Sequence, residues 1–159
     1  MTDYMKKHRM IFTLLLTSLL VVLGFAFHNS EQVVLAKSTK IDVQVGKKHL
    51  KGYLNNSSAA KSLKKKLPLT TVFVKGGAGL DENTTDLDFD LSTKKMPKGA
   101  SAKKGNIGYW SPDKRLVFYW GKVDYYEGIH IIGHFNSKND LKVIKNMKDN
   151  QKVIIKLHK

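Results

Sequence analysis

The sequence contains no cysteine among its 159 residues. The protein can therefore form no disulfide, has no thiolate nucleophile and cannot hold zinc through sulfur. Arginine is almost as scarce, because Arg115 is the only one beyond residue 36. Proteins that bind nucleic acids depend on the planar guanidinium group to contact phosphates and base edges. The shortage of arginine therefore argues against DNA or RNA as a partner.

Acidic residues are few relative to lysine. The chain has 28 basic and 13 acidic residues, and removing the three and two within residues 1–36 leaves 25 and 11, a net charge of +14. Such an excess favours anionic partners. For an exported protein these would be lipid head groups or anionic polymers of the cell envelope. A lysine-rich surface that only keeps the protein soluble explains the same composition.

A long uncharged run occurs near the N-terminus, at residues 10–27, and it follows a basic cluster at residues 6–9. This order is typical of an export signal. A signal peptidase could cleave after Ala36 or after Ala26. At about 1.5 Å per residue the run is also nearly long enough to cross a bilayer, so an uncleaved membrane anchor is the alternative.

These observations divide the chain into two parts. Residues 1–36 are predicted to be a signal peptide or N-terminal membrane anchor with a spacer, which implies an extracytoplasmic location. Residues 37–159 are predicted to be a single domain, long enough to build one core without metal or disulfide support.

The aromatic and apolar residues of the domain concentrate at residues 105–135. Three short runs, at residues 107–110, 116–120 and 129–135, are rich in β-branched and aromatic side chains, which is typical of strands. The residues between the first two runs, 111–114, contain proline and aspartate in positions that favour a turn. We expect a hairpin here and a central sheet around it.

Further elements flank this sheet. The pattern predicts helices between residue 58 and Pro68 and over 138–147, each preceded by serine or asparagine residues that can cap it. Residues 92–104 show no apolar periodicity and are predicted to be a mobile loop. Alternating or compact apolar patterns predict additional strands at residues 41–45, 49–54, 69–74, 86–91 and 152–157.

The order of these elements resembles the cyclophilin-like fold, and in particular bacterial cyclophilin-like families without an assigned function. The residues that carry the resemblance are the strand at 41–45, Leu67-Pro68-Leu69-Thr70, the Gly108-Tyr109-Trp110-x-Pro112 hairpin, Leu116-x-Phe118 and Ile131-Ile132-Gly133. The resemblance implies a mainly β fold with a closed eight-stranded barrel and two short helices.

The resemblance also implies a binding groove. In the prolyl isomerases of this fold an aromatic groove holds a proline ring, and Phe118, Tyr125 and His130 match the segments that supply it. Trp120 belongs to the aromatic set that could line a peptide groove. We therefore take Phe118, Trp120, Tyr125 and His130 as candidate ligand-binding residues.

No catalytic residue is predicted. Cyclophilin-type isomerases lower the barrier to rotation about an X-Pro bond with an arginine beside the imide nitrogen, and the motif that supplies it is absent here. Arg115 is predicted to lie in the hairpin turn, and a lysine lacks the guanidinium fork. His130 and His134 lie about 13 Å apart on an extended strand, at roughly 3.3 Å per residue, too far to share a metal unless Gly133 bulges the chain. We expect no metal and no cofactor.

The sequence thus predicts an exported cyclophilin-like domain that binds a peptide or small ligand in an aromatic groove. One alternative is an extracytoplasmic prolyl isomerase. The other is a basic module that binds anionic envelope polymers or lipid head groups.

Overall fold

The computed structural model describes residues 38–159 apart from residue 78, and the segment predicted as an export signal lies outside the described residues. Within the described residues, no helix has both the length and the hydropathy needed to span a bilayer.

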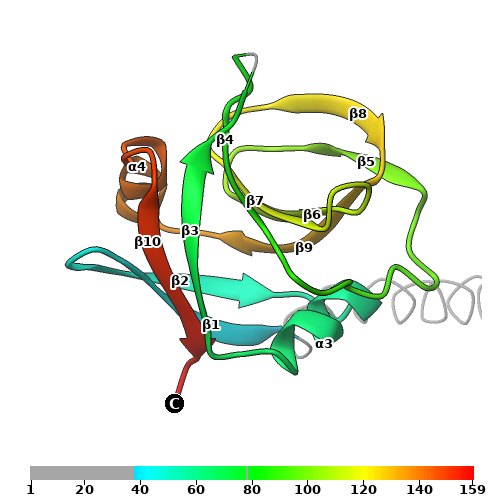
Figure 1. Cartoon of the computed structure of the whole chain (residues 1–159), viewed down its shortest axis with the longest axis horizontal. Coiled ribbons are helices and arrows are strands. Elements are labelled where there is room, and N and C mark those ends of the chain that lie inside the picture. The colour runs from blue at the N-terminus through cyan, green and yellow to red at the C-terminus, as the bar shows by residue number, and fades with distance from the viewer. Residues whose placement is uncertain (1–37, 78) are drawn as a thin grey trace, which may run out of the picture. The chain divides into compact units, whose positions relative to one another are not determined.

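Eight antiparallel strands close into a barrel (Figure 1) in the order β1-β10-β3-β4-β7-β6-β9-β2. Closure leaves no strand edge unpaired around the wall. The apolar runs at the hairpin form β6 and β7, with Ile107 opposite Phe118, so the predicted hairpin is confirmed. The barrel strands are β1 (Thr39–Val45), β2 (Lys48–Leu54), β3 (Leu69–Lys75), β4 (Glu82–Asp86), β6 (Asn106–Trp110), β7 (Arg115–Tyr119), β9 (Ile129–Phe135) and β10 (Gln151–Leu157).

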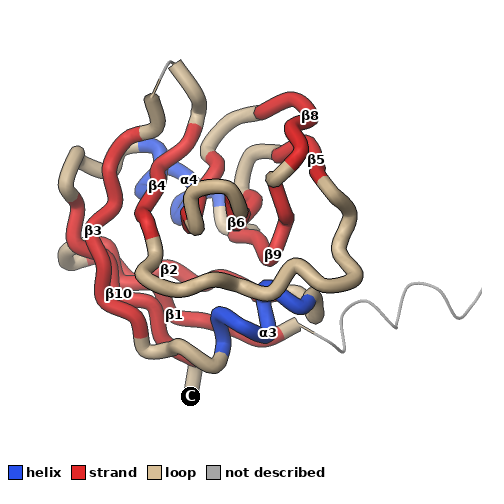
Figure 2. Tube along the Cα trace, turned by 45° about the vertical axis from the view of Figure 1, so that its right-hand side comes forward, coloured by secondary structure: helices blue, strands red, loops and turns tan. Residues whose placement is uncertain are grey.

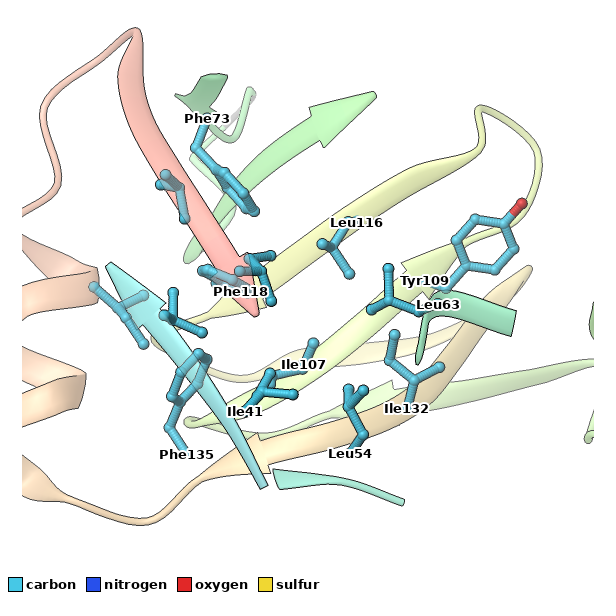
Figure 3. Close-up of a cluster of buried hydrophobic side chains, with 14 of the residues drawn as sticks. Ile41, Leu54, Leu63, Phe73, Ile107, Tyr109, Leu116, Phe118, Ile132 and Phe135 are labelled. Atoms are coloured by element: carbon cyan, nitrogen blue, oxygen red, sulfur yellow. The ribbon is translucent and has the colours of Figure 1, made fainter. Parts of the chain in front are cut away.

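The main core fills the barrel (Figure 3). Its inward-facing side chains come from all parts of the wall and from the helices, and they exclude solvent almost completely. Phe73 and Phe118 stack with ring centroids 4.4 Å apart, and Phe135 meets Phe118 edge-on at 5.1 Å. Aromatic pairs of this geometry add to the stabilisation that burial provides.

Two helices lie on opposite sides of the barrel (Figures 1 and 2). Helix α3 (Ser58–Lys64) begins at Ser57, whose Oγ accepts a hydrogen bond from the Ala60 amide at 3.2 Å. Helix α4 (Lys138–Lys145) begins in the same way at Ser137 and buries Ile144. Both predicted helices are confirmed, because the capping serines satisfy first-turn amides and one apolar side of each helix covers the core.

A separate two-stranded sheet consists of β5 (Gly99–Ala102) and β8 (Val123–Glu127). Sequence patterns did not predict either strand. The prediction of an unstructured loop over residues 92–104 was therefore wrong at its C-terminal end. Its first half is held to α3, because Ser58 Oγ donates to the Lys94 carbonyl at 2.7 Å and the Ser92 amide donates to Ser62 Oγ at 3.2 Å.

The predicted strand at residues 86–91 was also wrong. The strand in this region is β4, which ends at Asp86. Leu87 and Leu91 are buried as the alternation predicted, but their backbone amides donate to the Lys114 carbonyl in the turn and to the side-chain hydroxyl of Tyr109, and not to the backbone of a paired strand. The alternating pattern here therefore belongs to a segment outside the strands whose leucine side chains join the main core.

Candidate ligand-binding site

A second, smaller core lies on the outer face of the barrel wall. There β5 and β8 pack over β6, β7 and β9, and Figure 1 shows this pair beside the barrel strands. Val117 and Tyr119 point to this side, whereas Leu116 and Phe118, their neighbours on β7, point into the barrel. Both faces of β7 are therefore covered, as expected where a strand lies between two apolar layers.

A pocket of about 450 Å³ opens beside this second core. Its volume lies in the range of pockets that hold small organic ligands, roughly 300–1,000 Å³. Most of its surface is apolar or aromatic, with a few polar groups. It is lined by Leu80, Glu82, Trp110, Arg115, Val117, Tyr119, Val123, Tyr126 and Ile129.

One wall of the pocket depends on a glycine. Tyr119 is 1% exposed, and its ring lies against Gly108 on the neighbouring strand β6. A Cβ atom at position 108 would approach Cε2 of Tyr119 to 2.6 Å, so a larger residue would displace the ring. Burial raises the pKa of Tyr119, and the nearby charge of Glu82 raises it further. The phenol is therefore a neutral hydrogen-bonding group at the pocket wall.

Arg115 lies at the polar end of the pocket, already engaged by two carboxylates. Its Nε donates to Asp86 Oδ1 at 2.7 Å, and its Nη1 lies 3.3 Å from Asp113 Oδ2. The hydrogen bond that Arg115 donates to Asp86 raises the pKa of Arg115 despite partial burial. Asp113 Oδ2 also accepts the indole N–H of Trp110 at 3.1 Å, which orients a second pocket wall. The prediction that Arg115 belongs to the hairpin turn was wrong, because Arg115 is the first residue of β7.

Glu82 is the other ionisable group at this end. Among the described residues its carboxylate has no hydrogen bond or ion pair. Arg115 affects it only through the electrostatic attraction of a charge beyond ion-pair distance. Burial raises the pKa of Glu82, and the charge of Arg115 offsets part of that rise. Gly76 lies against the side chain of Glu82, where a Cβ atom would come within 2.4 Å of Cγ. Glu82 is thus a half-buried carboxyl group that lines an apolar pocket without a direct partner.

The four residues predicted to bind a ligand are not brought together. Phe118 is 0% exposed inside the barrel and offers no surface to a ligand in this conformation. Trp120 packs against the main core, and Lys145 Nζ lies 5.2 Å from its ring centroid. Tyr125 is 60% exposed on β8, close to Gly99. None of the four lines the pocket described above.

His130, the fourth candidate, is buried beside the hairpin turn. Its Nε2 lies 3.2 Å from Ser111 Oγ, and its ring is stacked with that of Tyr109. Nδ1 has no partner of good hydrogen-bond geometry among the described residues, although the backbone of Pro97 acts on the ring. Burial lowers the pKa of His130, and the Pro97 backbone partly offsets this. These contacts make His130 a residue that joins β9 to the turn and the loop before β5.

A shared metal site for His130 and His134 is not formed in the described part of the chain. The register of β9 against β6 does shift between Ile131 and Gly133. A bulge at Gly133 was the one condition under which the two histidines were expected to come close enough to share a metal. His134 nevertheless stacks on Tyr53 at 5.3 Å, away from His130. No group of three or more potential metal ligands occurs among residues 38–159 outside position 78.

The predicted residues are sequence neighbours of residues that line this pocket. Val117 and Tyr119 flank Phe118, Tyr126 follows Tyr125, and Ile129 precedes His130. Side chains alternate along a strand, so a shift of one residue exchanges one face of the sheet for the other. No sequence pattern indicated Leu80 or Glu82 as pocket residues. The strand predicted in this region began at residue 86, whereas β4 begins at Glu82.

The lysine-rich side of α3 faces solvent. Ala59, Ala60 and Leu63 are buried against the core, whereas Lys61 and Lys64 are exposed. This matches the amphipathic pattern of a surface helix. Binding of this side to anionic envelope polymers or lipid head groups stays a prediction.

The fold and the pocket together define a class of protein, namely an eight-stranded antiparallel barrel that carries a ligand-sized pocket on its outer wall. A family model described as the Cyclophilin-like family matches residues 43–156, and the chain belongs to this family. The resemblance found in the sequence and the fold that it implied are thereby confirmed.

Solved structures similar to the chain include a protein described as hypothetical. A hypothetical protein, AF2241 from Archaeoglobus fulgidus, is 15% identical, with a TM-score of 0.55, and the match covers 76% of this chain and 95% of that one. At this identity the similarity shows the fold alone. A search of the curated proteins found no match.

Proposed function

We propose that this protein is an exported cyclophilin-like binding protein that holds a small ligand, or a short part of a peptide, in the pocket between the barrel wall and β5–β8. The observation that supports it is the pocket of about 450 Å³ with apolar walls and a polar end at Glu82 and Arg115. Pockets that combine a large apolar surface with a few placed polar groups are the usual form of small-molecule sites. The export part of this proposal is based only on the sequence of residues 1–36.

The first test uses two adjacent tyrosines. Tyr126 lines the pocket and is 54% exposed, whereas Tyr125 is 60% exposed on the same strand and does not line it. We expect the neutral fluorescent probe N-phenyl-1-naphthylamine to bind the full chain saturably. Tyr126→Ala should weaken its binding about tenfold, because an aromatic ring contributes on the order of 1–3 kcal/mol when a ligand buries it.

Tyr125→Ala is the matched control and should leave probe affinity unchanged. Fluorescence titration of the three proteins measures this directly. A failure of the wild type to bind the probe would overturn the proposal. An equal loss in both variants would place the binding surface on the exposed side of β8 rather than in the pocket.

A second candidate, a slow extracytoplasmic prolyl isomerase, is favoured by one specific observation. Arg115 lies in an apolar pocket on the barrel wall, where a guanidinium group could donate to an imide nitrogen. Asp86 and Asp113 already engage that guanidinium group, which argues for weak activity.

A cis/trans assay on proline peptides with the full chain tests this candidate. Acceleration that disappears in Arg115→Lys but survives in Lys114→Ala would support it. Lys114 is a suitable control because it is the neighbouring cation, pairs with Asp90 at 3.1 Å and does not line the pocket. A rate equal to the uncatalysed rate, or one unaffected by Arg115→Lys, would exclude it.

A further inference from the structure

The charged groups around the pocket are mostly acidic, whereas the protein as a whole is basic. Arg115 supplies one positive charge, and Asp86, Asp113 and Glu82 are the carboxyl groups that act on it. Only Glu82 lines the pocket together with Arg115, whereas Asp86 and Asp113 lie outside the lining and offset the charge of Arg115; with all three ionised, these four groups carry a net charge of −2. The chain beyond Ala36 carries +14. The pocket is therefore a local acidic site on a basic protein.

The two oppositely charged groups in the lining differ in their availability. The guanidinium group of Arg115 is already paired with two carboxylates: its Nε lies 2.7 Å from Asp86 Oδ1, and its Nη1 lies 3.3 Å from Asp113 Oδ2. An anionic ligand would have to compete with these carboxylates for it. Glu82, by contrast, has neither a hydrogen bond nor an ion pair within the part of the chain that the structure describes. A half-buried carboxylate without a partner is unfavourable, and a cationic ligand group would supply the missing partner.

We propose that the pocket selects a protonated amine attached to an apolar body, with Glu82 as its counter-ion. This inference rests on the proposed function, because it names the ligand class of the same pocket. The apolar body would lie against Trp110, Val117 and Ile129, which line the pocket wall. The ammonium group would lie at the end where Glu82 lines the pocket, and the phenol of Tyr119 offers it a second acceptor. An ammonium ion donates up to three hydrogen bonds and accepts none, which suits a lining that offers a carboxylate and a phenol oxygen.

The basic surface opposes a cation only weakly. At physiological ionic strength, charges more than about 8 Å apart are largely screened in solvent. The interaction with Glu82 is short and partly desolvated, so screening reduces it less. The local acidic group therefore decides which ligands are favoured.

Three probes of matched size and different charge test the proposal: 2-phenylethylamine, 2-phenylethanol and 3-phenylpropanoate. Each displaces N-phenyl-1-naphthylamine from the full chain in a competition titration. We expect the amine to bind at least about tenfold more tightly than the alcohol, because hydrogen bonds to charged groups are roughly twice as strong as neutral ones. The carboxylate should bind most weakly.

Glu82→Gln should bring the affinity of the amine down to that of the alcohol, both measured with the same variant. Asp124→Asn is the matched control, since Asp124 is an exposed carboxylate that pairs with Lys122 at 2.8 Å and lies outside the pocket. It should preserve the preference for the amine, which excludes a general effect of protein charge.

The dependence on pH gives a second measurement that needs no variant. Arg115 and Tyr119 on β7 are the ionisable groups that act with Glu82, and Gly76, which lies against its side chain, has none. A bound ammonium group favours the ionised carboxylate. The affinity of the amine should therefore fall as the pH drops through the raised pKa of Glu82, while the affinity of the alcohol stays constant.

The outcomes are distinguishable. If the neutral fluorescent probe does not bind, the proposed function fails and the inference fails with it. If the probe binds but the amine and the alcohol compete equally, or the carboxylate competes best, only the inference is overturned. An amine preference that survives in Glu82→Gln and is independent of pH would also overturn it.

Discussion

Phe118→Ala should destabilise the protein by about 3–5 kcal/mol, the usual cost of removing a buried phenylalanine ring from a core. Phe118 is 0% exposed and contacts two other aromatic rings, those of Phe73 at 4.4 Å and Phe135 at 5.1 Å. Truncation would leave a cavity between three barrel strands that cannot collapse without distorting the wall. Urea unfolding monitored by circular dichroism measures the change in the free energy of unfolding.

This result would separate two interpretations of Phe118. The family resemblance places it in a ligand groove, whereas the structure places it in the core. As a control, Tyr125→Ala removes an exposed ring and should change stability by no more than about 0.5 kcal/mol. If Phe118→Ala left stability intact but weakened probe binding more than Tyr126→Ala does, the groove interpretation would be correct.

The difference between these interpretations shows what a strand pattern can predict. The run from Leu116 to Tyr119 is apolar throughout, and all four residues are buried. When a strand is covered on one face, polar residues identify the other face. Here β5 and β8 cover the outer face, so that signal is missing from β7. The sequence could therefore locate the strand but not decide which side chains face the pocket.

The covering sheet itself was missed for a related reason. In β8 only Val123 is buried, and the following residues through Glu127 are exposed. In β5 the sequence Gly-Ala-Ser-Ala has no large apolar side chain. Neither segment carries the alternation that predicts a strand. Their pairing instead depends on contacts with the barrel wall, where Ala102 and Val123 pack against Val117 and Tyr119.

Strands such as β1 and β10 were predictable because they bury one face and leave the other more exposed. Strand β4 had no hydrophobic pattern at all, since its buried residues Asn83, Thr84 and Thr85 are polar. Their hydrogen bonds explain the burial: Asn83 Nδ2 donates to the Ile144 carbonyl at 2.8 Å, and the hydroxyl groups of Thr85 and Thr71 lie 2.6 Å apart. Buried polar groups that find partners are stable. Hydrophobic periodicity cannot predict a strand whose buried residues are polar. The strand at Glu82 was therefore missed, and Glu82 was not recognised as a pocket residue.

Gly133→Ala should also destabilise the protein strongly, by at least about 1–3 kcal/mol, the cost of overpacking a site that cannot relax. Gly133 lies on β9 opposite Leu54 of β2 and opposite Ile107 of β6. A Cβ atom there would approach the backbone carbonyl oxygen of Tyr53 to 2.3 Å. Because that oxygen belongs to a paired strand, it cannot move aside as the end of a flexible side chain would. The substitution would push β2 away from β9 at the seam that closes the barrel.

Gly77→Ala is the matched control for Gly133→Ala. A Cβ atom at Gly77 would meet nothing within 4 Å, so this variant should unfold at the wild-type urea concentration or slightly above it. Thermal and urea unfolding of the two variants give the comparison. Equal stability of both would mean that the β2–β9 seam has room for a methyl group at position 133.

The pocket lies on the opposite side of β9 from this seam's core residues, so a folded fraction of Gly133→Ala should still bind N-phenyl-1-naphthylamine. Loss of the probe site in that folded fraction would mean that the pocket depends on closure of the whole barrel, and not only on β5, β8 and the wall beneath them.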